Sequence, residues 1–193
     1  MRKAADSTVV APSSWDDATL AACRCGDRVA LARVLAAEAP RVERTLSRIV
    51  GSRSDVEDLL QKTLVAAVRQ FPSFRGEASV RTWLTSIAVR LARDHVRRAK
   101  HLTLITNPED PAPGPERMLD ARRRLERLHE LLGRIDSKKR VAFVLHVIEG
   151  RSMDEVAALM GASRAATKSR VWFARRKLMK AMEHDPLFRE EER

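Results

Sequence analysis

The chain has 193 residues, of which 37 are Lys or Arg and 26 are Asp or Glu, so its formal net charge is +11. A single domain usually takes roughly 100 to 200 residues, so this length permits one modest domain or two small ones. The 44% hydrophobic content, with only 7 glycines and 8 prolines, excludes a disordered or fibrous chain and favours helices. The excess of positive charge predicts nucleic acid or an acidic protein surface as a partner.

The sequence also argues against a membrane protein and against a disulfide scaffold. No run approaches the roughly 18 apolar residues of a spanning helix, and residues 1–10 lack the apolar stretch of a signal peptide. We therefore expect a cytoplasmic protein with no membrane insertion. Cys23 and Cys25 are too few for a disulfide framework and lack the companion pair of a zinc site. Reduced thiols and no metal or other cofactor are expected, with a redox or metal role as the alternative.

Two helices are predicted at the start of the chain. The first spans about residues 16–25 and is stopped by Gly26. The second spans about residues 27–50 and is ended by Gly51, since glycine readily adopts the left-handed conformation that follows a helix. We expect Pro40 to break this helix because proline lacks the amide hydrogen that the helix needs.

A third and a fourth helix follow. Ser54 and Glu57 have the spacing of a capping box, which predicts the start of the third helix, and Pro72 lies just beyond its end. The fourth helix starts near Ser79, after the loop FPSFRGE. Its apolar residues step by three or four, as the buried side of a helix does. These residues are Val80, Leu84, Ile87 and Leu91.

A linker separates this block from the rest of the chain. Residues 101–120 hold four prolines and four acids against one arginine, and prolines at this spacing favour extended backbone. The predicted fold is all-α, with two small helical domains joined by this Pro-rich acidic linker. The expected organisation is an N-terminal tail (1–14), a first domain (15–101), the linker (102–117), a second domain (118–184) and an acidic tail (185–193).

About four more helices are predicted after the linker. The first covers about residues 118–135, and Asp136 can cap a second that runs up to Gly150. Ser152 and Glu155 form another capping box, at the start of a helix of two turns. The long basic helix that follows completes the block.

The last two helices have the arrangement of a helix-turn-helix, with Gly161 in the turn and Ser163 as the cap of the second helix. The second helix of this motif lies in the DNA major groove. Residues 163–182 contain seven bases and no acid. Helical spacing assigns Thr167, Val171, Ala174 and Leu178 to the core. The other side is expected to meet base edges through Ala165, Ser169, Trp172, Phe173 and Arg176, and phosphates through Arg164, Lys168 and Lys180.

Two features of this block allow alternatives. Trp172 and Phe173 either contact thymine methyl groups or pack on a partner protein or on the first domain. The tail from residue 183 to 193, with five acids and two bases, is expected to be a solvated end. Its alternative role is to fold back on the recognition helix and weaken DNA binding.

A second basic region precedes the linker, because residues 62–101 contain nine Lys or Arg and two acids. Two polyanion-binding modules on one chain indicate two contacts on one long ligand. The run from Asp55 to Arg98, with FRGEAS followed by TWL and IA, resembles region 2 of the extracytoplasmic-function (group IV) sigma factors of bacterial RNA polymerase. Residues 136–182 resemble their region 4.

The resemblance implies a dissociable specificity subunit of RNA polymerase that directs promoter-specific initiation, and not an enzyme. It implies binding to the β′ clamp helices through Asp58, Gln61, Lys62 and Leu64, and to the β flap through the apolar side of region 4. It also implies that Phe74, Arg75, Arg90, Arg93, Arg97 and Arg98 lie in or beside the part that recognises and opens the minus-ten element. Region 4 would read the minus-thirty-five element through Lys168, Ser169, Trp172 and Phe173.

The resemblance further implies control by an anti-sigma factor as an additional partner. Lys62 and Leu64 depart from the family's usual residues in the core-binding helix, and these departures bear on the strength and geometry of core binding. Phe173 stands where a base is common in the recognition helix, so we expect an unusual promoter sequence. The alternative function is a helix-turn-helix regulator that binds duplex DNA without replacing sigma. The five histidines are scattered, and no cluster has catalytic or metal-binding spacing, which argues against an enzyme acting on nucleic acid.

Overall fold

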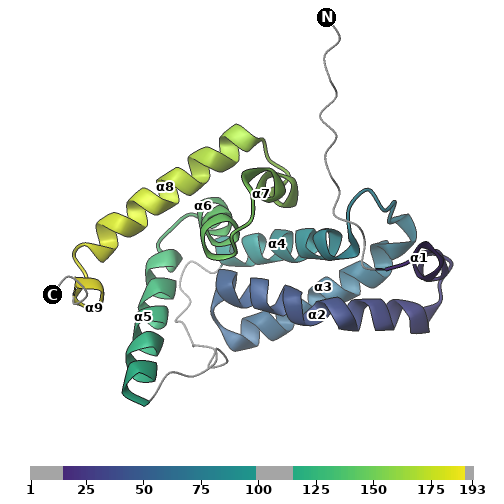
Figure 1. Ribbon diagram of the computed structural model, residues 1–193, viewed down its shortest axis with the longest axis horizontal. Helices are drawn as coiled ribbons and strands as arrows, with labels where there is room; N and C mark the ends of the chain where they lie inside the picture. Colours follow the sequence, from purple (N-terminus) through teal and green to yellow (C-terminus); the bar gives the residue numbers. More distant parts are fainter. Residues whose placement is uncertain (1–14, 99–114, 190–193) are drawn as a thin grey trace, which may run out of the picture.

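The structure is a computed structural model that describes residues 15–98 and 115–189, and every regular element in these ranges is a helix (Figure 1). The predicted N-terminal tail, residues 102–114 of the linker and the last four residues lie outside the described residues. The first block comprises α1 (Asp17–Arg24), α2 (Arg28–Val50), α3 (Arg53–Gln70), the short 3-10 helix η1 (Phe71–Ser73) and α4 (Val80–Arg98).

Local side-chain caps explain where most of these helices begin. The Asp16 carboxylate accepts from the Thr19 amide at 2.7 Å, and Asp27 caps α2 through the amides of Val29 and Ala30. The capping box predicted at Ser54 is wrong. Helix α3 already begins at Arg53 with no side-chain cap, and the Glu57 carboxylate pairs with Arg53 one turn away at 3.1 Å.

Helix α2 is continuous through Pro40, so the predicted break is also wrong. Proline at this position removes one backbone hydrogen bond. Buried residues on both sides of it, including Val34, Leu35, Val42 and Leu46, hold the two halves on the same core. Packing of this face outweighs the lost hydrogen bond, as is usual for helices within proteins.

The second block comprises α5 (Pro115–Gly133), α6 (Ser137–Phe143), a π-helical turn η2 (Val144–Ile148), α7 (Met153–Met160), α8 (Arg164–Met182) and α9 (Pro186–Arg189). Helix α5 begins within the predicted linker, at Pro115, where proline suits the first turn of a helix. Asp136 caps α6 as predicted, accepting from the Lys138 amide at 3.1 Å.

The described part of the tail, up to residue 189, is not the solvated end that the sequence predicted. Asp185 is only 4% exposed and its Oδ2 accepts from Arg127 Nε at 2.6 Å. Helix α9 packs against α5, and Phe188 contacts the hydrophobic core. Arg127 of α5 therefore holds Asp185, and with it the start of α9, against the second block.

The two blocks pack against each other, with α4 between them (Figure 1). One side of α4 faces α2 and α3, and α6 and α7 of the second block pack against it as well. Thr85, Val89 and Ala92 are all at most 2% exposed, in addition to the apolar residues that the sequence assigned to the core. The buried residues of both blocks form one continuous hydrophobic cluster.

Candidate nucleic-acid interface

Helices α7 and α8 form the predicted helix-turn-helix. At the start of α7, Ser152 and Glu155 make the complete capping box, with amide-to-side-chain distances of 2.8 and 3.2 Å. Gly161 ends α7 with φ +57°, a left-handed conformation that favours glycine. Ser163 then accepts from the Ala166 amide at 3.2 Å and starts α8. Local chemistry thus fixes both ends of the turn that orients α8.

The buried side of α8 is the one that helical spacing predicted, since its four buried residues are Thr167, Val171, Ala174 and Leu178. The opposite side is open to solvent. The predicted contact residues on it are all exposed: Arg164, Ala165, Lys168, Ser169, Trp172, Phe173 and Arg176.

Trp172 and Phe173 form an aromatic pair on this exposed side. Their ring centroids are 4.8 Å apart and nearly perpendicular, and the residues are 53% and 48% exposed. Arg176 stacks on Trp172 at 5.3 Å, and Lys139 of α6 lies 5.2 Å from the Phe173 ring centroid. These ring and cation contacts all lie within the second block, on α6 and α8. Two cations beside exposed rings make a surface suited to both phosphates and base edges.

Two of the basic residues of α8 have polar neighbours on other helices. Arg164 Nε lies 3.5 Å from Asp154 of α7, with both side chains largely exposed. Lys177 Nζ donates to the Arg134 carbonyl, tying α8 to the end of α5. An exposed pair such as Arg164 and Asp154 contributes little to stability, so Arg164 can exchange its carboxylate for a phosphate at low cost.

The second basic region begins with Lys62 and Arg69 of α3, and its other described members lie on the loop before α4 and along α4 itself. The Arg75 side chain is 84% exposed and 3.9 Å from Glu77, and Arg90 is also exposed. At the end of α4, Asp94 sits between Arg93 at 3.8 Å and Arg97 at 3.6 Å. Arg98 is exposed beside them.

Phe74, in the same loop, is buried rather than exposed. It is 5% exposed, and its ring packs 5.4 Å from Phe71 and 5.2 Å from Trp83. The ring completes a three-ring cluster with η1 and α4 and so anchors the loop. Phe74 also lines a cavity beside the loop, and its expected place in or beside the minus-ten part stays a prediction. Trp83 is partly buried and packs against the core.

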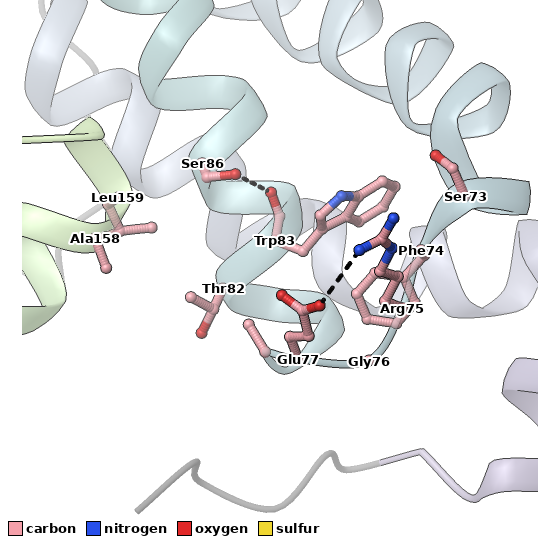
Figure 2. Close-up of a pocket in the computed structure, with 11 residues that line it drawn as sticks. Ser73, Phe74, Arg75, Gly76, Glu77, Thr82, Trp83, Ser86, Ala158 and Leu159 are labelled. Atoms are coloured by element: carbon pink, nitrogen blue, oxygen red, sulfur yellow. Dashed lines mark hydrogen bonds and ion pairs between the residues drawn. The ribbon is translucent and has the colours of Figure 1, made fainter. Parts of the chain in front are cut away.

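A cavity of about 330 Å³ opens beside this loop, and sequence reasoning missed two residues that line it. Thr82 and Ser86 face the cavity from α4, together with Trp83 and residues 73–78 of the loop (Figure 2). Thr82 and Ser86 are four positions apart, so on a helix their hydroxyls lie on the same face. This spacing is the sequence signal that could have predicted them as neighbours. The remaining wall comes from Ala158 and Leu159 of α7, in the other block.

Helix α3 presents the residues predicted to bind core polymerase. Asp58, Gln61 and Lys62 are exposed, whereas Leu64 is half-buried against the core. Lys62 Nζ donates to Asp58 Oδ2 at 2.5 Å. Lys62, which departs from the family pattern, therefore neutralises the charge of Asp58 on the same face of α3. Val65 and Val68, 46% and 51% exposed, extend this face with apolar surface that the sequence analysis did not single out.

The cysteines and the acidic residues show no metal chemistry in the described part of the chain. Cys23 is buried, and burial raises the pKa of its thiol, whereas Cys25 is exposed. No group of three or more His, Cys, Asp or Glu that could hold a metal ion occurs among residues 15–98 and 115–189. Within the same ranges, no helix is both long and apolar enough to cross a membrane.

Comparison with known proteins matches both blocks. The family Sigma-70 region 2 matches residues 34–102, and the family Sigma-70, region 4 matches residues 125–178. The RNA polymerase sigma factor CnrH of Cupriavidus metallidurans is 33% identical over 144 residues, which cover 68% of this chain and 75% of that protein. NccH of Alcaligenes xylosoxydans, another RNA polymerase sigma factor, is 30% identical over 173 residues, covering 86% and 93%.

A solved structure gives the same result for the fold. The structure of CnrH in complex with the cytosolic domain of CnrY is similar with a TM-score of 0.63 and 26% identity. The similarity covers 87% of this chain and 97% of that one.

Proposed function

The chain belongs to the sigma-70 family as an extracytoplasmic-function RNA polymerase sigma factor, and from this premise we propose how its surfaces share the work of initiation. Residues 15–101 form the domain that binds core polymerase and the minus-ten element. Residues 118–184 form the domain that binds the minus-thirty-five element.

Helix α8 reads the minus-thirty-five element through its exposed side. The observation that carries this proposal is a 19-residue helix with no acid, whose core-facing stripe leaves an aromatic pair and cations on the solvent side. Phosphate contacts from Arg164 and Lys168 set the register, and Ala165, Ser169, Trp172, Phe173 and Arg176 face the bases.

The loop before α4 and the basic side of α4 bind the minus-ten element. Opening a duplex costs about 1.4 kcal/mol per stacked step, and basic side chains along the separated strand offset that cost. Arg75, Arg90, Arg93, Arg97 and Arg98 supply the charge. Phe74 acts indirectly, since its buried ring fixes the loop that carries Arg75.

Helix α3 binds the β′ clamp helices of core polymerase through Asp58, Gln61, Lys62 and Leu64. The ion pair between Lys62 and Asp58 makes the centre of this face locally neutral, and Val65 and Val68 add exposed apolar area to it. Neutral apolar surface of this kind is characteristic of the buried centre of protein interfaces. Region 4 contacts the β flap through its apolar side.

An anti-sigma factor is the further partner. CnrH, whose fold this chain shares, was solved with the cytosolic domain of CnrY bound to it. The surfaces that serve polymerase remain exposed here, including Val65 and Val68 on α3, and a regulatory protein that covers them would prevent assembly of the holoenzyme.

The experiment mixes the purified full-length protein with core RNA polymerase, separates the complex by gel filtration and assays run-off transcription. We expect a stable complex that initiates at specific sequences. Gln61→Arg should weaken the complex, whereas Arg44→Glu, on an exposed position of α2, should not. Tight duplex binding by the free protein, with no complex and no initiation, would favour the stand-alone regulator instead.

A further inference from the structure

Lys139 of α6 lies beside the exposed side of α8, although α6 is not part of the helix-turn-helix. Helix α6 packs against α8 (Figure 1). Lys139 Nζ is 5.2 Å from the centroid of the Phe173 ring, and Phe173 is 48% exposed. A helix outside the motif therefore supplies a cation to the surface that carries the proposed DNA contacts.

The Lys139 side chain is restricted in position while its charge stays accessible. The residue is half-buried, and a lysine in this environment packs its aliphatic stem and keeps its charged end in water. The face of an aromatic ring attracts a cation, so the Phe173 ring limits where the ammonium group can lie. Among the described residues, no acid forms an ion pair with Lys139. Its charge is available to an anion, and less side-chain entropy is lost when the anion binds.

The two rings of α8 mark the two edges of its exposed side. Successive residues of a helix are about 100° apart, so Trp172 points to one edge and Phe173 to the other. At this spacing, Arg164 and Lys168 lie toward the Trp172 edge. The cation from α6 therefore lies on the edge opposite Arg164 and Lys168.

The two edges face different strands of a DNA duplex that α8 enters. A recognition helix in the major groove lies between two phosphate backbones, one on each side of the groove. When Arg164 and Lys168 contact one backbone, the other passes the Phe173 edge, beside the ammonium group of Lys139. A lysine binds a phosphate oxygen through a short charge-assisted hydrogen bond. Lys139 is thus placed to hold the second strand.

We propose that Lys139 binds a backbone phosphate of the minus-thirty-five element, on the strand opposite to the one that Arg164 and Lys168 contact, while the Phe173 ring positions its ammonium group. This inference rests on the proposed function of α8 and adds a DNA contact from outside α7 and α8. Because the contact is to phosphate, it strengthens binding and helps to fix the register without selecting a base.

The test measures binding of a labelled promoter by the holoenzyme of core polymerase and the full-length protein, at about 50 and about 200 mM salt. Each phosphate contact adds about 0.9 to the slope of log affinity against log salt concentration. Lys139→Gln should therefore weaken binding about tenfold at the lower salt and about threefold at the higher, a loss of ~0.9 in slope. Lys139→Arg keeps the charge and should keep the parent slope.

Lys138→Gln is the matched control, because it removes the same charge from the next position of α6, which is exposed. It should bind the promoter with the parent slope. An equal loss of slope in Lys138→Gln would overturn the proposal, since the effect would then come from net charge alone. A loss in Lys139→Gln that is the same at both salt concentrations would also overturn it, because Lys139 would then only support the ring or the fold. Thermal unfolding followed by circular dichroism checks that both variants are folded.

Gel filtration with core polymerase separates this inference from the proposed function. All three variants should assemble with core polymerase as the parent does. Weaker assembly of Lys139→Gln, with unchanged salt dependence of promoter binding, would assign Lys139 to polymerase and contradict the proposal. A parent protein that neither assembles nor binds the promoter would refute the proposed function itself, whereas a parent that does both beside a Lys139→Gln variant of equal slope would refute this inference alone.

Discussion

The ion pair between Arg81 and Glu38 gives an asymmetric prediction about stability. Arg81, in the first turn of α4, places Nε 3.0 Å from Glu38 Oε2 of α2 and so fixes the start of the helix that follows the minus-ten loop. The Glu38 side chain is 4% exposed and that of Arg81 is 41% exposed. Removing the cation leaves a nearly buried carboxylate without its partner, whereas removing the anion leaves a guanidinium that water can reach.

Arg81→Met should therefore lower the free energy of unfolding by about 3 kcal/mol. Glu38→Gln should lower it by only about 1 kcal/mol, because the exposed part of Arg81 can be hydrated. The measurement is urea unfolding of the full-length protein, followed by circular dichroism. The double variant should be more stable than Arg81→Met alone, since it holds no unpaired buried charge. Equal losses for the two single variants, or a double variant that loses their sum, would refute this reasoning.

Three further predictions concern the second block. Ser152→Ala should lower stability by about 1 kcal/mol through loss of the capping box, while Ser54→Ala, which removes no cap, should cost much less in the same unfolding assay. Burial, aided by the nearby charge of Arg140, lowers the pKa of His129 from 6.5. The contribution of His129 to the free energy of unfolding is therefore fully present above pH 6.5 and is lost as the pH falls through its lowered pKa. His129→Gln should flatten the pH dependence of the free energy of unfolding, and an unchanged slope would contradict this. In a selected promoter, replacing minus-thirty-five thymines by deoxyuridine should weaken binding by about 0.8 kcal/mol per contacted methyl group. Trp172→Ala should abolish that difference and Met179→Ala, equally exposed on α8, should not; a difference that survives Trp172→Ala would exclude the ring as the contact.

Sequence alone predicted the features that depend on local chemistry. The stripe of Thr167, Val171, Ala174 and Leu178 follows from helical spacing and is the buried side of α8. The capping box at Ser152 is confirmed because both of its hydrogen bonds lie within four residues. The two blocks and their family were predictable for the same reason, since the motifs that carry them are continuous in sequence.

Features that depend on long-range packing were not predictable. The break expected at Pro40 does not occur, because buried residues on both halves of α2 pack on the same core. Long-range packing also decides the environment of Asp185, whose partner Arg127 is 58 positions away. The packing of the two blocks against each other could not be predicted from a sequence pattern. Arg140 donates to the backbone carbonyl of residue 50, and any amino acid at that position would supply the same acceptor.

The central claim is that one chain reads two promoter elements for RNA polymerase. The most direct measurement is run-off transcription by core polymerase and this protein from a randomised promoter library, with sequencing of the templates that initiate. The account predicts two sequence blocks at a fixed spacing, with the upstream block alone altered by Trp172→Ala and the downstream block alone altered by Arg75→Ala. A single block, or no initiation despite tight binding of duplex DNA by the free protein, would contradict it.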